Sequence, residues 1–216
     1  MNNRGAMNIS QILLEYKAVS LSTEKPFRYT SGILSPIYCD NRILLTDPRS
    51  RKIITEHFVE IIKKNSLEFD VICGVATGAI AWGALVADAL EKPFIYVRSE
   101  KKEHGKGQAV EGKLNPRQQV LIIEDLISTG GSSIKAIENI REAGGIVKEC
   151  IAIFMYGMEK SQQTFKDIDC RLFTLTTLSE LLKTAVTDQA ITKEQQSIIL
   201  DWIGDAANWG KKHGFE

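Results

Sequence analysis

Two adjacent carboxylates, Glu124 and Asp125, stand just before a loop of small residues at 128–132, whose sequence is S-T-G-G-S. A glycine-rich loop that opens a helix exposes backbone N–H groups, and the helix dipole adds partial positive charge there, so such a loop binds phosphate. The carboxylates suit a different group, because like charges repel and a carboxylate accepts hydrogen bonds from hydroxyls. A phosphate loop beside two hydroxyl acceptors indicates a site for a ribose 5-phosphate.

A strand and a helix must position these groups. Residues 120–123 are apolar and three of the four are β-branched, which predicts a strand buried on both faces. After the loop, Ile134, Ile137 and Ile140 recur at helical spacing. The carboxylates are therefore expected at the edge of a sheet, where ligands of open α/β folds bind. An ordinary strand-to-helix turn would explain the glycines but not two consecutive acids after a buried strand.

The stretch E-D-L-I-S-T-G-G-S resembles the PRPP-binding motif of type I phosphoribosyltransferases, and in this form that of the orotate phosphoribosyltransferases. The resemblance implies transfer of the phosphoribosyl group of PRPP (5-phospho-α-D-ribosyl 1-diphosphate) to orotate, giving orotidine 5′-phosphate and pyrophosphate in pyrimidine biosynthesis. It makes Asp125 a catalytic residue and places Ser128 near orotate as well as PRPP. The PRPP contacts that it implies here are Glu124, Asp125, Leu126, Ile127, Ser128, Thr129, Gly130, Gly131 and Ser132.

A polar, glycine-containing segment at 99–112 follows a predicted strand at 93–98. Such a run is usually a solvated charged hairpin, and loops of this length are often lids. It resembles the mobile catalytic loop R-x-x-x-K-x-H-G of the same family through Arg98, Lys102 and His104. The resemblance implies that all three bind PRPP, that Lys102 and His104 are catalytic, and that the loop is shared across a homodimer interface.

Residues 26–42 are punctuated by Gly32 and Pro36, which predicts a hairpin. It could be only a cover over the sheet. Its S-G-x-x-S-P-x-Y pattern is similar to the family segment that lies over the orotate ring, which implies orotate contacts from Ser31, Gly32 and Tyr38. Some members carry a lysine where this chain has Thr30, and an orotate-binding arginine near the strand end at 154–157, where this chain has none.

A second strand-to-helix turn, A-T-G-A at 76–79, follows an apolar run at 71–75. Its small residues suggest another anion loop. In the family this turn meets the pyrophosphate of PRPP, so any such contact here is expected from the backbone of Thr77 and Gly78. The alternative is a turn made only for tight helix packing.

The composition limits the partners. Lysine plus arginine equals aspartate plus glutamate at 27 each in 216 residues, so no overall field recruits nucleic acid or an anionic membrane. No apolar run is long enough for a membrane span, and no signal-peptide pattern is present. The four cysteines form no C-x-x-C pair and are expected as buried thiols. We expect a cytoplasmic enzyme whose Mg²⁺ arrives on the PRPP diphosphate, without a protein metal site.

Strands and helices alternate along the chain, which predicts an α/β fold with a mainly parallel sheet flanked by helices. The resemblance implies the type I phosphoribosyltransferase fold, as one domain over 1–216 with an N-terminal hood at about 9–45 above the base site. Ser10 is predicted to cap a helix that runs to about residue 19, and a last helix is predicted over 192–209. It would carry Trp202 and Trp209 on one face.

Two other functions stay open. A purine phosphoribosyltransferase would share the PRPP loop, although the S-G-x-x-S-P segment and the R-x-x-x-K-x-H loop disfavour it. A regulator that binds PRPP without turnover is expected to carry a basic nucleic-acid face, of which the zero net charge gives no hint. A P-loop lookalike at 107–113 is followed by Leu114 in place of serine or threonine, and by Pro116.

Overall fold

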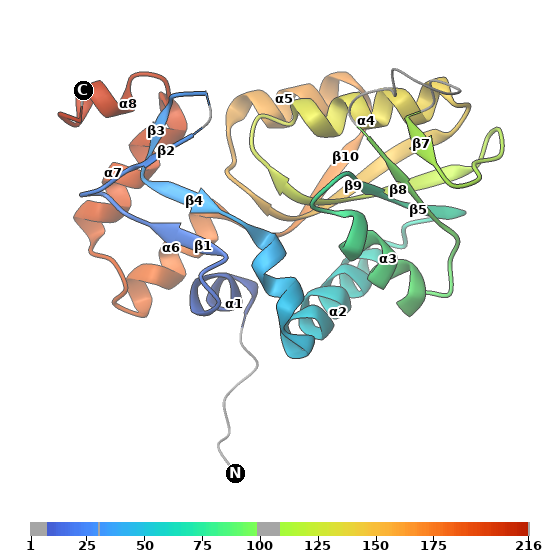
Figure 1. Cartoon of the computed structure of the whole chain (residues 1–216), viewed down its shortest axis with the longest axis horizontal. Helices are drawn as coiled ribbons and strands as arrows, with labels where there is room; N and C mark the ends of the chain where they lie inside the picture. The colour runs from blue at the N-terminus through green and yellow to red at the C-terminus, as the bar shows by residue number, and fades with distance from the viewer. Residues whose placement is uncertain (1–7, 30, 99–108, 216) are drawn as a thin grey trace, which may run out of the picture.

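The computed structural model describes residues 8–29, 31–98 and 109–215, which form two lobes side by side (Figure 1). The larger lobe is built on a six-stranded sheet. The smaller lobe combines the first strands of the chain with its last helices. It thus contains more than the N-terminal hood expected at about 9–45, and from here on we call the whole smaller lobe the hood. No helix in the described ranges is long and apolar enough to cross a membrane.

The large sheet has the strand order β10-β9-β8-β5-β6-β7, and all its neighbouring pairs are parallel except β6 with β7. The predicted mainly parallel α/β fold is therefore confirmed. The strands are β5 (Val71–Val75), β6 (Phe94–Val97), β7 (Val110–Glu111), β8 (Gln119–Ile127), β9 (Ile146–Met155) and β10 (Arg171–Thr177).

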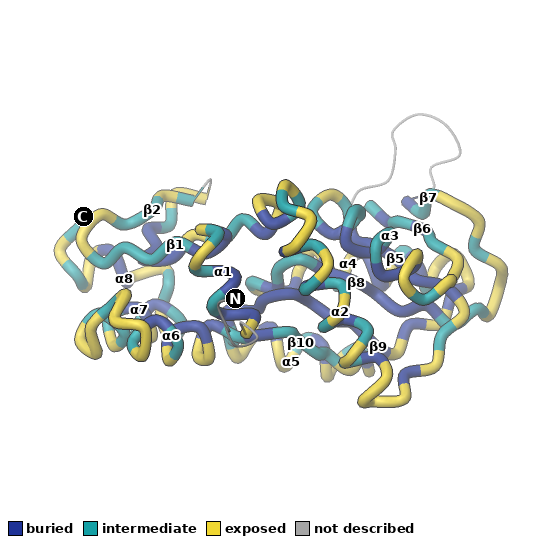
Figure 2. Tube along the Cα trace, turned by 90° about the horizontal axis from the view of Figure 1, so that it is seen from below, coloured by how far each residue is buried: buried dark blue, intermediate teal, exposed yellow. Residues whose placement is uncertain are grey.

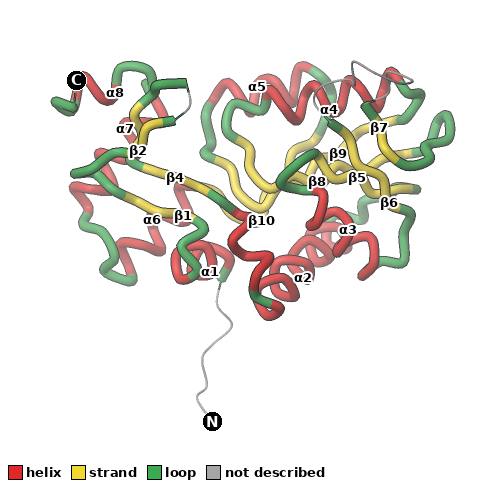
Figure 3. The backbone as a smooth tube through the Cα atoms, viewed as in Figure 1, coloured by secondary structure: helices red, strands yellow, loops and turns green. Residues whose placement is uncertain are grey.

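Helices cover both faces of this sheet (Figure 3). On one face lie α2 (Pro48–Lys64) and α3 (Ile80–Ala89), and on the other α4 (Gly131–Glu142) and α5 (Glu159–Asp167). Successive strand side chains point to opposite faces. Leu121 and Ile123 accordingly join the core under α2 and α3, while Ile122 joins the core under α4 and α5. The central strands are buried along most of their length (Figure 2).

The hood comes from both ends of the chain. Its strands pair as β1 with β4 and β2 with β3, all antiparallel, so the predicted hairpin within 26–42 is present as β2 and β3. The N-terminal elements are α1 (Ile9–Glu15), β1 (Val19–Leu21), β2 (Phe27–Arg28), β3 (Leu34–Ser35), β4 (Ile37–Cys39) and the 3-10 helix η1 (Asn41–Thr46). The C-terminal elements are α6 (Leu178–Thr187), α7 (Lys193–Gly204) and α8 (Trp209–Lys212).

Two predicted helices have wrong boundaries. Asn8, not Ser10, caps α1, which ends at Glu15; Ser10 lies inside the helix, where its hydroxyl bonds to that of Thr176 at 2.7 Å. The last predicted helix is split after Gly204. The carboxylate of Asp205 accepts hydrogen bonds from the backbone and side chain of Asn208, and this local turn competes with continued helix.

The split places Trp202 and Trp209 in different helices, although both are buried. Trp202 joins the hood to the large sheet. Its indole N–H donates to the carbonyl of Leu34 at 3.0 Å, and its ring meets those of Tyr29 and Tyr156 edge-on. The hydroxyls of Tyr29 and Tyr156 lie 3.1 Å apart. Tyr156 follows β9 directly, so this cluster fixes the hairpin of the hood against the end of a central strand.

Replacing Trp202 with phenylalanine tests this anchor. Trp202→Phe removes the indole donor from a buried carbonyl and leaves space beside the ring, so we expect the free energy of unfolding to fall by about 2 kcal/mol or more. Urea denaturation measures it. The control is Leu200→Ala in the same helix, whose side chain is 40% exposed and whose loss should cost about 0.5 kcal/mol or less. A Trp202→Phe cost as small as the control's would contradict the anchoring role.

Candidate active site

The site lies where the sheet reverses its winding. β5 has β6 on one side and β8 on the other. The chain leaves β5 through α3 toward β6, and leaves β8 through α4 toward β9, which lies in the opposite direction in the sheet. A crevice therefore opens between β5 and β8 at their carboxyl ends. The turn at 76–79 follows β5, and Asp125 lies near the end of β8. The two are in close contact: a Cβ added to Gly78 would lie 2.0 Å from the Asp125 Oδ2 atom. A glycine at 78 therefore makes room for the carboxylate.

The sequence predicted that the strand ends before the acidic pair, but β8 continues through it to Ile127. Since side chains alternate along a strand, Glu124 and Asp125 point to opposite faces of the sheet. Glu124 points to α4, where its carboxylate accepts from the Ser133 hydroxyl at 2.7 Å. Asp125 faces the turn at Gly78. The structure thus brings Asp125 into contact with the turn after β5, and the ribose contacts of both acids stay predictions.

The two carboxylates also differ in their electrostatic surroundings. Glu124 is 3% exposed, and burial, followed by the nearby charge of Asp125, raises its pKa to about 8. Asp125 is half-buried. Burial raises the pKa of Asp125 as well, while the charge of Arg42 works in the opposite direction. Burial thus favours the neutral form of Glu124 more strongly than that of the less buried Asp125.

The predicted phosphate loop joins β8 to α4. Gly130 has φ +85°, a left-handed conformation that strains any residue with a Cβ, and α4 begins at Gly131. The first amides of a helix have no acceptor within the helix. Thr129, Gly131 and Ser132 are exposed, so an anion can approach these amides. Ile127 is fully buried, which limits it to backbone contacts.

Arg98 directly follows β6. Its carbonyl accepts from the Asn139 side chain at 2.9 Å, its N–H donates to the Ala109 carbonyl at 3.0 Å, and its guanidinium pairs with Glu111. Lys102 and His104 lie outside the described residues, so their predicted roles stay predictions.

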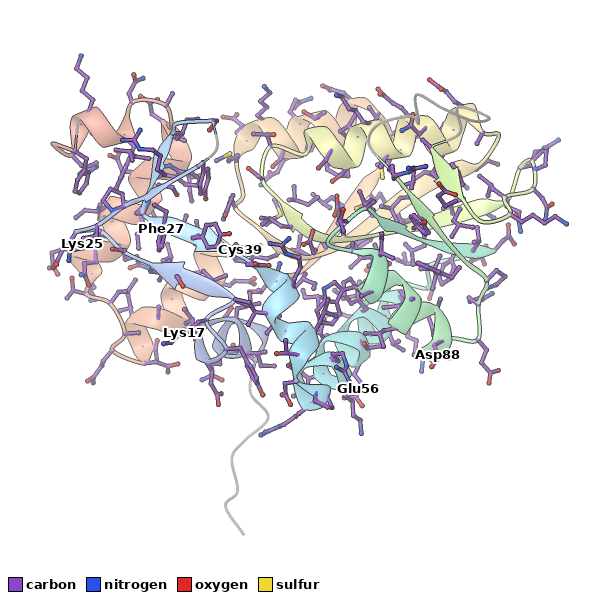
Figure 4. The ribbon with its side chains drawn as sticks, in the orientation of Figure 1. Lys17, Lys25, Phe27, Cys39, Glu56 and Asp88 are labelled. Carbon is purple, nitrogen blue, oxygen red and sulfur yellow. The ribbon has the colours of Figure 1, made fainter. Side chains whose placement is uncertain are left out.

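The predicted base residues lie in the hood. Ser31 and Gly32 are exposed in the turn between β2 and β3, with Gly32 at φ +87°. Tyr38 is 44% exposed, and its ring lies 5.7 Å from that of Phe27. Figure 4 shows Cys39 on the side of the hood toward the larger lobe and Phe27 further from that lobe. Phe27 was missed from the sequence, although its place just before the predicted hairpin turn was a usable signal.

A second residue missed from the sequence is Asn41, which begins η1 directly after the β4 strand and Asp40. It is 1% exposed, and its side-chain N–H donates to the Asp125 carbonyl at 2.6 Å. The two residues are far apart in the sequence, so no local pattern could have shown the contact. Asn41 thus links the end of β4, which carries Tyr38, to β8, which carries Asp125.

Comparison with known proteins identifies the family. Residues 41–185 match the model of the phosphoribosyl transferase domain. The chain is 45% identical over 203 residues to the orotate phosphoribosyltransferase of Listeria monocytogenes, with 94% of this chain and 97% of that one covered. The chain belongs to the orotate phosphoribosyltransferase family.

Solved structures agree with this membership. An orotate phosphoribosyltransferase from Aeropyrum pernix superimposes with a TM-score of 0.73 at 31% identity, covering 82% of this chain and 97% of that one. The UMP synthase of Leishmania donovani gives a TM-score of 0.78 at 25% identity, covering 94% of this chain and 43% of that one. The predicted type I phosphoribosyltransferase fold is confirmed.

Metal ligands are not grouped in this orotate phosphoribosyltransferase site as far as it is described. Within residues 8–29, 31–98 and 109–215, no group of three or more histidine, cysteine, aspartate or glutamate residues could hold a metal ion. The four cysteines are free thiols, and burial raises the pKa of each.

The raised pKa of Glu124 has a testable effect on stability. Between about pH 5 and 8 the unfolded chain ionises this carboxyl while the folded protein keeps it protonated, so wild-type stability falls as pH rises through this window. Glu124→Gln has no such proton and should gain stability relative to the wild type from about pH 5 to 8, with the difference constant above that window. Unfolding free energies from urea titrations across pH measure this.

The control for removing a glutamate is Glu138→Gln on the exposed side of α4. Wild type and Glu124→Gln running parallel across the whole pH range would contradict a protonated Glu124.

Proposed function

We infer that the protein transfers the 5-phosphoribosyl group of PRPP to orotate, giving orotidine 5′-phosphate and pyrophosphate in pyrimidine biosynthesis. The observation that carries this is the crevice in which Asp125, the turn at Gly78 and the amides opening α4 converge beneath the hood. Relatives named orotate phosphoribosyltransferase at 45% and 44% identity support orotate as the base.

The chemistry is a displacement at the anomeric carbon of PRPP. Positive charge develops on the ribose as the bond to pyrophosphate breaks, and the Asp125 anion, held in a partly buried site, stabilises that charge. The amides of 128–132 hold the 5′-phosphate at the start of α4. The last residues of β8 set the distance between these amides and Asp125, so one continuous segment binds both the ribose and the 5′-phosphate.

The base enters from the hood side. Ser31 and Gly32 offer exposed backbone groups, and Tyr38 with Phe27 offers an aromatic surface for the flat ring. Orotate already carries an ionisable ring nitrogen, so the chain needs no dedicated general base. The strand end where some family members carry an arginine holds Tyr156 here, which is buried against Tyr29 and Trp202.

The pyrophosphate side rests on the segment after β6. By the family resemblance, Lys102 and His104 neutralise the leaving pyrophosphate together with Arg98. In the structure Arg98 is paired with Glu111, so binding of a diphosphate exchanges one anionic partner for another. We propose that the enzyme is a homodimer in which loop 99–112 serves the neighbouring subunit.

Magnesium enters with the substrate. When bound, Mg²⁺ neutralises charge on the diphosphate, and substrate oxygens supply most of its ligands. The four free thiols fit a reducing compartment, and we place the enzyme in the cytoplasm.

An ultraviolet assay tests the reaction. Loss of orotate absorbance is followed with PRPP and Mg²⁺, with hypoxanthine, adenine and uracil in parallel. We expect turnover of orotate alone. Turnover of another base would keep the PRPP site and overturn the orotate assignment, and PRPP binding without any turnover would favour a regulator.

Removing the charge of Asp125 tests its role. Asp125→Asn keeps the shape but loses a charged hydrogen bond worth roughly 1.5–3 kcal/mol, so kcat/KM for PRPP should fall by about tenfold or more. The control is Asp188→Asn at the exposed end of α6. An Asp125→Asn enzyme with the kcat/KM of the control would remove Asp125 from the mechanism.

A methyl group at the turn after β5 tests the contact with Asp125. In Gly78→Ala the new Cβ would overlap the Asp125 carboxylate, which can rotate away at small cost to the fold. We expect kcat/KM to fall by about tenfold or more, from a displacement of the order of 1 Å, while the melting temperature stays close to that of the wild type. The control is Gly204→Ala, whose Cβ would meet no atom within 4 Å. Equal kinetics in both variants would show that this contact is not needed.

A further inference from the structure

The carboxylate strand β8 extends beyond the strand that pairs with it on one side. The register of β5 with β8 ends at the pair Gly74 and Ile123, whereas β8 continues to Ile127. The register with β9 on the other side passes from Glu124 to Leu126 and skips Asp125. The backbone carbonyl of Asp125 therefore needs a hydrogen-bond donor from outside the sheet, because a buried carbonyl is costly to leave unpaired.

Asn41 supplies this partner. Its side-chain N–H donates to the Asp125 carbonyl at 2.6 Å, and its Oδ1 atom accepts from the Cys39 thiol at 3.5 Å. With 1% of its surface exposed, the amide is held in place and bonded on both sides. It occupies the position that a longer β5 would have taken.

The segment that carries Asn41 also carries the base-facing residues. Tyr38 and Cys39 end β4, and Asn41 opens η1 two residues later. Asp40 holds the start of this 3-10 helix by accepting from the Arg42 N–H at 3.1 Å and by pairing with the Arg42 guanidinium at 2.7 Å. A shift of the hood relative to the sheet must therefore stretch the bond between Asn41 and Asp125.

We propose that Asn41 is a positioning residue that sets the distance and angle between the base bound under the hood and the ribose bound at Asp125. This inference rests on the proposed function, because it assigns Asn41 to the alignment step of that reaction. Asn41 touches neither reacting group. It acts through the backbone of Asp125 on one side and the end of β4 on the other.

The role has a kinetic signature. Alignment of two reactants affects turnover, and a misplacement of the order of 1 Å can cost about 100-fold in rate. The PRPP contacts of the loop at 128–132 do not depend on Asn41. We expect Asn41→Ala to lower kcat about tenfold or more, with the dissociation constant for PRPP, measured by calorimetry, changing less than about threefold.

The matched control is Asn65→Ala. The Asn65 side chain also donates to a backbone carbonyl, that of Ile61 at 2.8 Å, but at the end of α2. It should keep the kcat of the wild type. Should Asn41→Ala keep its kcat as the control does, or lose PRPP affinity and melting temperature in parallel with kcat, the positioning role is wrong.

A second variant tests the hydrogen bond itself. In Asn41→Asp, a protonated carboxyl can still donate to the Asp125 carbonyl, whereas an ionised one cannot and repels it. The ratio of the kcat of this variant to that of the wild type should therefore fall as pH rises. The ratio for Asn41→Ala should not change with pH. Titratable groups near Asp125 are Glu124 on its own strand and Cys39 and Arg42 from the hood, and all are common to the proteins compared.

A pH-independent ratio for Asn41→Asp, whether high or low, would overturn the role of the bond, and this comparison holds even if Asn41→Ala does not fold. The wild type is assayed alongside. A wild type that does not consume orotate refutes the proposed function, whereas an active wild type with an equally active Asn41→Ala refutes only the inference.

Discussion

The unequal lengths of β5 and β8 are the constraint on which the site depends. In a parallel sheet the crevice opens where neighbouring strands wind away from each other, and here β8 runs on after β5 has turned aside. The overhanging part of β8 has an open edge with backbone groups to satisfy. The turn at Gly78, the Asn41 amide and the opening of α4 all gather around this overhang. The functional groups of the site are thus arranged around an incomplete stretch of sheet.

The same overhang separates the two acids. Because the strand continues through them, its alternation sends Glu124 toward Ser133 and Asp125 toward the crevice. Burial then favours the neutral form of Glu124, and two adjacent anions are avoided. Glu124 also accepts from the Asp125 N–H at 3.2 Å, so it helps to fix the backbone of its neighbour.

How far the sequence could predict this structure depends on how local each feature is. The glycine turn that opens α4 and the strands at 71–75 and 93–98 follow from nearby residues, and the sequence located them. The end of β8 was misjudged because acids after an apolar run resemble a strand end, and only pairing with β9 shows that the strand continues. The contact between Asn41 and Asp125 joins residues that no sequence period connects. The helix break after Gly204 was missed because its cause, the Asp205 side chain, suits a helix surface equally well.

The contacts that support the predicted base residues join distant parts of the chain, so only the fold shows them. The hairpin of the hood is short, and two such strands alone are only marginally stable in water. The indole of Trp202, from the far end of the chain, bonds the carbonyl of Leu34 and packs on Tyr29. Tyr156 reaches the same cluster from the sheet. The hairpin is therefore held by the C-terminal helices and by the end of β9, and Asn41 joins the segment that follows it to the strand of Asp125. The hood hairpin and the strand of Asp125 are far apart in the sequence, and their relative position depends on the few buried polar bonds that join them to the rest of the fold.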